Sequence, residues 1–233
     1  MNWKEIEVSE CSTFFKYKGQ TLFNKRFKEI LKFHSEGLAP VSDETGWYHI
    51  DMNGNPIYEE RYEKAFGYYF GKSAVIYHGN WFHINTNGDK CYPEEYAWCG
   101  NFQENICTVR NSNNQYFHIN EDGKSLYPET YRYAGDFKDG FAVVKLKSGL
   151  CKHINKSGTN LNGMQYLNLG VYHKSFATAK DESGWFHIDK NGMQLYNERY
   201  LSIEPFYNGF SLVETIDNKN IVIDETGMAV VNI

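Results

Sequence analysis

The sequence repeats itself with a period of 34 or 35 residues, and this repetition constrains the fold more than any other feature. Glycines at 19, 54, 88, 123, 158, 192 and 227 mark the period. The text around them recurs, as in WYHIDMNGNPIYEERY, WFHINTNGDKCYPEEY and WFHIDKNGMQLYNERY. A unit this short cannot bury its own apolar face, so its copies must cover one another in a repeat architecture.

Each copy has the pattern of several short β-strands. The stretch W-F-H-I-D alternates and is rich in aromatic and β-branched residues, which is typical of a strand. Asp or Asn opens a four-residue turn that ends on the glycine, as from Asp51 to Gly54, and a second strand should follow. A third run follows a tyrosine such as Tyr62, and a fourth carries a small anchor residue. The anchors are Ala39, Ala74, Cys107, Ala142, Ala177 and Ser211. We therefore expect four strands per repeat and an all-β fold.

Six periods predict a six-repeat β-propeller-like toroid, because small residues suit the crowded strands around a propeller axis. An antiparallel β-solenoid is the alternative. We interpret residues 1–11 as an N-terminal extension and 12–233 as a single repeat domain. A hairpin at 14–23 is left over, and the segment 27–31 could complete the last strands near 221–224 and 229–232.

Composition excludes several classes of protein. An aromatic content of 17% is too high for a disordered chain. The net charge of −5, without a basic run, argues against nucleic-acid binding. The apolar runs are too short for a membrane helix, and no signal peptide is evident. The five cysteines are odd in number and widely spaced, which favours free thiols and a cytoplasmic location. We expect no cofactor and no membrane partner.

One repeat position is histidine in five copies, namely His49, His83, His118, His153 and His187. A ring of imidazoles around an axis could bind a metal ion. Packed sheets lie about 10 Å apart, whereas zinc–nitrogen bonds are about 2 Å long. We therefore favour a structural hydrogen bond within each blade and predict no metal site. The recurring aromatic residues at 47, 81, 116 and 185 and at 58, 92, 127 and 196 could stack on sugars, but packing between blades is the favoured interpretation.

The motif W-x-H-I-D-x-x-G, followed by F-x-x-G-x-A-x-V, resembles the bacterial WG (KWG) repeat family from about residue 12 to the end. The family's Trp-Gly pair is replaced here by Trp-Tyr or Trp-Phe, which indicates a divergent branch. The resemblance implies a β-repeat binding or scaffolding module in a bacterium. It transfers no catalytic residue.

Function should lie where the repeats differ, since the positions that stack are constrained. The connections before the small anchors differ most, and in a propeller they would meet at one mouth. The candidate ligand-binding residues are His173, Lys174, Tyr207, Asn208, Lys138 and Asp139, with Asp181 and Glu204 close to them in sequence.

No linear motif of an enzyme is present, although a propeller site can be assembled from several blades. We therefore lean against an enzyme and predict a non-catalytic binding or scaffolding module. It would recognise a protein or a small ligand at one face. The alternatives are a multivalent carbohydrate-binding lectin, or a metal or enzyme site in the central channel.

Overall fold

A computed structural model of the chain describes residues 1–232. In this range the fold is all-β, and the one helical element is a single 3₁₀ turn, η1 (Trp3–Glu5). No described helix has the length and apolarity needed to cross a bilayer. The chain divides into two compact units: an N-terminal unit of residues 1–114 and 118–125, and a C-terminal unit of residues 115–117 and 126 onward.

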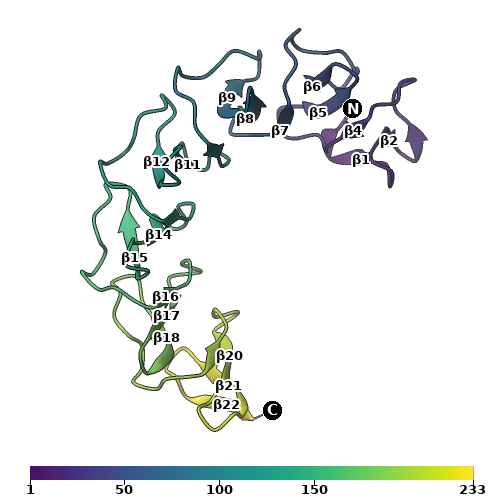
Figure 1. Cartoon of the computed structure of the whole chain (residues 1–233). Helices are drawn as coiled ribbons and strands as arrows, with labels where there is room; N and C mark the ends of the chain where they lie inside the picture. The colour runs from purple at the N-terminus through teal and green to yellow at the C-terminus, as the bar shows by residue number, and fades with distance from the viewer. Residues whose placement is uncertain (233) are drawn as a thin grey trace. The chain divides into compact units, whose positions relative to one another are not determined.

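Four sheets follow one another along residues 6–119 (Figure 1). The first contains β1 (Ile6–Val8), β2 (Phe15–Tyr17) and β3 (Gln20–Thr21), and the second contains β4 (Glu29–Ile30), β5 (Ala39–Asp43) and β6 (Gly46–Ile50). The third contains β7 (Lys64–Tyr69), β8 (Lys72–Tyr77) and β9 (Asn80–Asn85), and the fourth contains β10 (Trp98–Cys99), β11 (Cys107–Arg110) and β12 (Tyr116–Ile119).

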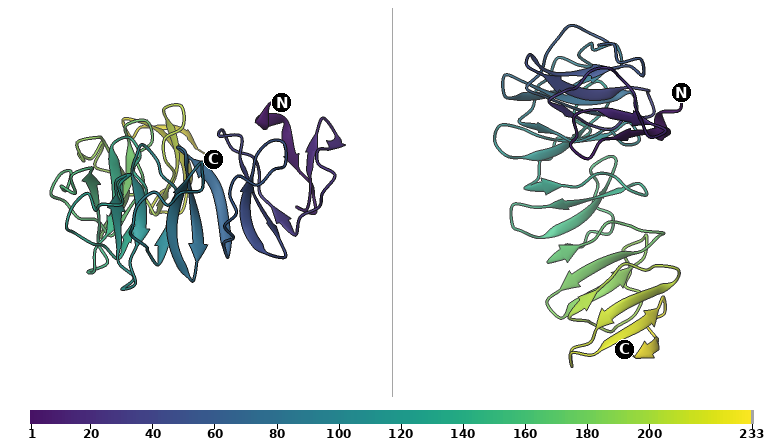
Figure 2. Two further views of the ribbon diagram at one scale, coloured as in Figure 1. Left: turned by 90° about the horizontal axis from the view of Figure 1, so that it is seen from above. Right: turned by 90° about the vertical axis from the view of Figure 1, so that its right-hand side faces the viewer.

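Three further sheets belong to the C-terminal unit, and Figure 2 shows their strands one after another. The fifth sheet contains β13 (Tyr133–Ala134), β14 (Phe141–Lys145) and β15 (Cys151–Asn155). The sixth contains β16 (Asn168–Leu169), β17 (Ala177–Asp181) and β18 (Gly184–Ile188). The seventh contains β19 (Ser202–Ile203), β20 (Phe210–Glu214), β21 (Asn220–Asp224) and β22 (Ala229–Asn232).

The predicted turns form as the sequence indicates. In the third sheet, Asn85 Oδ1 accepts hydrogen bonds from the backbone N–H groups of Asn87 and Asp89 at 2.9 and 3.0 Å. Gly88 closes this turn with φ of +90°, a backbone conformation that residues other than glycine rarely adopt. Each turn therefore ends the histidine-bearing strand at a defined residue.

The expected second strand of each repeat is wrong for the second to sixth sheets. Residues after the turn make only isolated bridges, such as Ile50 with Pro56 and Trp47 with Tyr62. Between Pro56 and Tyr62 the chain makes no regular strand pairing with β6. In this stretch the Tyr58 hydroxyl lies 2.5 Å from Nδ1 of His49. Among the described residues, the first and seventh sheets have a regular strand here, β3 and β22, and neither sheet carries the histidine.

The left-over hairpin belongs to the first sheet, which is additional to the six repeats that were expected. β2 and β3 form this hairpin, and β1 pairs with β2, placing Ile6 opposite Tyr17. β1 lies within the segment that we expected to be an extension. The expected pairing of residues 27–31 with the last strands is also wrong, because β4 pairs with β5. The interpretation of 12–233 as a single domain stays a prediction.

Each unit has its core between its own successive sheets, and one isoleucine per repeat is fully buried. These residues are Ile50, Ile84, Ile119, Ile154 and Ile188. In four sheets the small anchor pairs with the following isoleucine, as Ala177 does with Ile188. In the third sheet the residue opposite Ile84 is Ser73, so the predicted anchor Ala74 is one residue out of register.

Candidate functional site

Four of the recurring histidines, His49, His83, His153 and His187, join their own sheet to the next one. His187 Nε2 lies 2.9 Å from the backbone oxygen of Glu204, which follows the first strand of the seventh sheet. His49, His83 and His153 make the same bond to the next sheet at 2.8, 3.0 and 2.9 Å. The bond to the carbonyl therefore connects neighbouring sheets, whereas the bond expected within a blade is made to a tyrosine hydroxyl of the same copy in three copies.

Hydrogen-bond chemistry fixes the tautomer of these rings. A carbonyl oxygen only accepts, so Nε2 carries the proton and donates it. Nδ1 then accepts from a tyrosine hydroxyl 2.5 Å away in three copies: Tyr58 for His49, Tyr92 for His83 and Tyr196 for His187. In those three copies neither nitrogen can ligate a metal ion without breaking a bond. Within residues 1–232 no group of three or more His, Cys, Asp or Glu side chains is arranged to hold a metal ion.

Burial keeps these imidazoles neutral. Desolvation lowers the pKa of His49, His83, His153 and His187 from 6.5 to about 4, although the bond to the carbonyl favours the charged form. A neutral buried imidazole with both nitrogens bonded is a structural group. Four of the eight recurring aromatic residues, Trp47, Tyr92, Tyr127 and Tyr196, are buried and serve packing. The other four, Tyr58, Trp81, Tyr116 and Trp185, are half-buried.

The predicted candidate residues lie on the hairpin turns that connect the first and second strands of each sheet. In the C-terminal unit, Lys138, His173 and Tyr207 each form a bridge with the phenylalanine three residues later. The two residues between them have positive φ: Asp139 and Gly140, Lys174 and Ser175, and Asn208 and Gly209. This is the pattern of a tight two-residue hairpin turn, which holds its flanking side chains in defined positions.

The structure brings His173 and Tyr207 together. Their ring centroids are 5.3 Å apart, at an interplanar angle of 46°, and they come from neighbouring turns. Tyr207 is nevertheless 61% exposed. Lys174 and Asn208 are exposed beside them, on the same two turns. This set combines an aromatic platform with a cation and an amide.

The other predicted residues do not join the group formed by His173, Lys174, Tyr207 and Asn208. Lys138 and Asp139 are exposed on the preceding turn of the same unit. Asp181 lies at the opposite end of β17 from the turn and forms an ion pair with Arg199, with Nη2 and Oδ2 2.8 Å apart. The Glu204 side chain is exposed, while its backbone oxygen accepts from His187.

The N-terminal unit repeats the pair of rings at the same register positions. His34 and Tyr69 have centroids 4.8 Å apart in an edge-to-face arrangement. His34 lies directly on Gly67, where any side chain would clash with the imidazole. Burial is the main reason that the pKa of His34 lies below 6.5. Both rings line a pocket of about 460 Å³, together with Lys32, Phe66, Gly67 and Asn101 among others.

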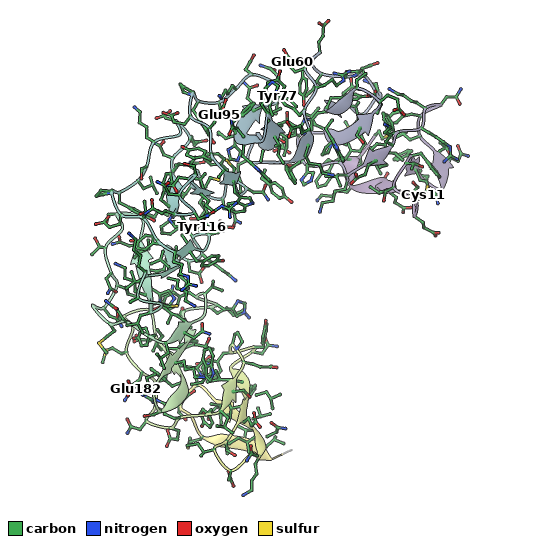
Figure 3. All side chains as sticks on the ribbon, viewed as in Figure 1. Cys11, Glu60, Tyr77, Glu95, Tyr116 and Glu182 are labelled. Carbon is green, nitrogen blue, oxygen red and sulfur yellow. The ribbon has the colours of Figure 1, made fainter. Side chains whose placement is uncertain are left out.

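Sequence reasoning did not single out this pocket, although the available signal was that His34 and Tyr69 match His173 and Tyr207 in the repeat. A pocket of about 610 Å³ in the same unit includes Arg61 and Tyr77. An adjoining pocket of about 430 Å³ shares these two residues and includes Glu60; Figure 3 labels Glu60 and Tyr77. The Arg61 guanidinium lies 3.9 Å from the centroid of the Tyr48 ring.

Comparison with solved structures identifies the fold. The computationally designed Ika8 protein matches with a TM-score of 0.51 and 12% identity, over 100% of this chain and 85% of that one. BamB from Moraxella catarrhalis matches with a TM-score of 0.51 and 12% identity, over 98% of this chain and 81% of that one. At this identity the likeness concerns the fold alone, which is propeller-like.

Comparison with sequences adds the family. No curated protein matches the chain. A family model described as "WG containing repeat" matches residues 118–150, from the histidine of one copy through the small anchor of the next. The assignment to a divergent branch stays a prediction. The match at 118–150 spans about one period of the repeat, and over these residues the chain is similar to the WG repeat family.

Proposed function

We propose that this chain is a non-catalytic binding module that recognises a protein partner through the hairpin turns of its C-terminal unit. The observation that carries this proposal is the exposed Tyr207 ring, which packs on His173 between two tight turns. Aromatic residues that are already held in place bind with a small loss of side-chain entropy, and they dominate many protein interfaces.

The surroundings of the pair suit a protein surface. Phe210 and Val171 are 47% and 50% exposed and add apolar area. Lys174 and Asn208 supply a cation and an amide at the edge. A central aromatic group with polar groups around it is the usual anatomy of a protein interface. Lys138 and Asp139, on the preceding turn, would extend the contact.

A pull-down with matched variants tests this proposal. We would immobilise the wild-type chain, the double variant His173→Ala/Tyr207→Ala, and the control Met193→Ala, whose side chain is 66% exposed on a different turn of the same unit. Proteins enriched by the wild type and the control, but lost at least tenfold from the double variant, would support the proposal. No enrichment by the wild type, or equal enrichment by the double variant, would contradict it.

A small ligand is the second candidate, because the pocket of about 460 Å³ has the size of a ligand site. A glycan array and a small-molecule screen address it directly. Binding that is lost in Tyr69→Ala but kept in Tyr207→Ala would favour the N-terminal pocket over the C-terminal turns. The multivalent lectin was suggested by repeated aromatic residues that could stack on sugars. Those repeated aromatic residues that are buried cannot do so. An enzymatic activity and a cytoplasmic location stay open to direct assay.

A further inference from the structure

One arginine occurs at the same repeat position in both units. Arg61 follows the second sheet and Arg199 follows the sixth, and the text before them is almost the same, SDETGWYHID and KDESGWFHID. The Arg61 guanidinium lies 3.9 Å from the ring centroid of Tyr48, and the Arg199 guanidinium lies 3.8 Å from that of Phe186. Since the two arginines are held in equivalent places, their hydrogen bonds can be compared directly.

Arg199 uses all of its guanidinium nitrogens within the protein. Its Nε and Nη2 lie 2.9 and 2.8 Å from Oδ2 of Asp181, and Nη2 also donates to Oε1 of Gln194 at 3.1 Å. Its Nη1 donates to the backbone oxygens of Asn197 and Glu198 at 3.2 Å each. This copy therefore has no nitrogen without an acceptor.

Arg61 keeps the bonds of Nη1 and lacks those of Nη2. Its Nη1 donates to the backbone oxygens of Glu59 and Glu60 at 2.8 and 2.9 Å, and its Nε donates to Oγ1 of Thr45 at 3.0 Å. Within residues 1–232 no acceptor is bonded to Nη2. A guanidinium has five N–H groups, and two of them are on Nη2. Arg61 therefore retains two donors for a ligand.

Two differences in sequence between the copies explain why Arg61 is less engaged. Tyr48 stands where the sixth sheet has a phenylalanine, and its hydroxyl donates to Oδ2 of Asp43 at 2.9 Å. In the sixth sheet the corresponding carboxylate oxygen binds the arginine. Pro56 stands at the position of Gln194, and its side chain offers no acceptor. The residues that saturate the arginine in one unit are thus diverted or replaced in the other.

Arg61 lines the pocket of about 610 Å³ in the N-terminal unit. Three carboxylates on the wall of this pocket each have a lysine partner: Glu29 with Lys64, Asp43 with Lys25, and Glu44 with Lys28. Of the Asp, Glu, Lys and Arg side chains on this wall, Arg61 and Glu63 are the two without a partner of opposite charge among the described residues. The pocket therefore presents one unpaired cation and one unpaired carboxylate.

Aromatic rings form another part of the same wall. Tyr62 and Tyr77 meet edge to face with ring centroids 6.1 Å apart, and Tyr77 is 46% exposed (labelled in Figure 3). Tyr77 also packs on His78, at a centroid distance of 4.1 Å. A ring that its neighbours hold in place can receive an aromatic group with a small loss of entropy. The volume of the pocket lies within the range of small-ligand sites.

We propose that this pocket binds a small aromatic zwitterion, an amino acid or a dipeptide. The carboxylate of the ligand accepts from Nη2 of Arg61, as Asp181 does from Arg199 in the other unit. The ammonium group of the ligand lies against Glu63, and its aromatic ring packs on Tyr77. A molecule with only one of the two charges leaves one charged group of the pocket unpaired, so it binds more weakly. This site does not depend on the turns proposed to bind a protein.

A nuclear magnetic resonance titration of the full chain tests this proposal. Phenylalanine and phenylalanylphenylalanine are zwitterions with different distances between their charges, whereas phenethylamine carries the cation alone and phenylpropanoate the anion alone. At least one zwitterion should bind with a dissociation constant below about 1 mM, and at least tenfold more tightly than either singly charged probe. Binding of neither zwitterion at up to about 10 mM, or equal affinity for all probes, would overturn the proposal.

Single variants locate each charge of the ligand. Arg61→Gln should remove the preference for the zwitterion over phenethylamine, and Glu63→Gln should remove the preference over phenylpropanoate. Tyr69→Ala changes the separate pocket of about 460 Å³ in the same unit and should leave both preferences unchanged. Zwitterion binding that is lost in Tyr69→Ala, or that persists unchanged in Arg61→Gln, would place the ligand elsewhere and overturn the proposal.

A double variant tests the site without removing the arginine. Tyr48→Phe/Pro56→Gln restores both residues of the sixth sheet, so Asp43 and the introduced amide should then engage Nη2 of Arg61. Zwitterion binding should weaken at least tenfold, while an unaltered circular dichroism spectrum would show that the variant is folded. A folded double variant that binds the zwitterion as tightly as the wild type would contradict the assigned role of Arg61.

Discussion

Moderate acid should unfold this protein through its buried histidines. His49, His83, His153 and His187 have a pKa of about 4 in the native fold, against 6.5 when exposed. The unfolded chain therefore binds protons more readily than the native one. The stability that this difference provides is complete above pH 6.5 and is lost as the pH falls toward 4.

The size of the effect follows from these values. At pH 5.5 an unfolded imidazole is protonated about ten to one, whereas a native one is almost entirely neutral. Linkage then gives a loss of roughly 1.4 kcal/mol per histidine and about 6 kcal/mol for four. A typical domain is stable by only about 5–15 kcal/mol. Carboxyl groups such as Asp51 and Asp181 have a pKa below 3.8, so they contribute little in this interval.

Urea unfolding followed by tryptophan fluorescence at pH 8 and pH 5.5 measures this loss. The exposed His78 provides a control, since His78→Gln should leave the difference between the two pH values unchanged. Nuclear magnetic resonance of the imidazoles gives an independent reading in the native state. A difference in unfolding free energy below about 2 kcal/mol, or native buried rings that titrate near 6.5, would refute the reasoning.

Three further outcomes are expected from single sites. Gly158→Ala should destabilise the fold by about 2 kcal/mol more than Gly149→Ala, measured by urea unfolding. Both glycines have positive φ, but only at 158 would a Cβ lie 2.7 Å from a tyrosine ring, while position 149 is open. Tyr196→Phe should cost about 1–3 kcal/mol in the same assay, because His187 Nδ1 loses its buried donor. Iodoacetamide at pH 7 should modify Cys11 first, since neighbouring hydroxyls lower its pKa to about 7 and it is exposed; peptide mass spectrometry would refute this if a buried cysteine reacted earlier.

The repeat period was enough to predict the all-β, propeller-like fold, because each copy carries its own turn and strand signals. The second strand of each repeat was predicted wrongly for a reason that lies in three dimensions. Pattern rules treat PIYE as a strand, whereas the tyrosine within it turns inward to bond the histidine. The anchor at Ser73 was missed by one residue, since register follows from the hairpin turn at Phe70 and Gly71.

The candidate residues were predictable as a group, and their geometry was not. Sequence variation among the turns pointed to His173 and Tyr207, but the 5.3 Å between their rings depends on how closely two sheets pack. The separation of Asp181 from this group follows from the length of β17, which places it at the far end of the strand. The hairpin of the first sheet was predicted but could not be placed in a repeat, because its copy of the motif, TFFKYKGQ, has lost the histidine and the tryptophan.

The bond from each imidazole to the following sheet gives the array a direction. Removal of a copy that precedes a histidine-bearing sheet leaves no buried N–H group without an acceptor. The proton of that ring still meets the carbonyl of the sheet that follows it. Removing the last copy would leave the proton of His187 without the Glu204 oxygen. Gene duplications that add or remove copies should therefore be tolerated before the first histidine-bearing sheet more readily than directly after the sheet of His187, where the following sheet has Val222 at the histidine position.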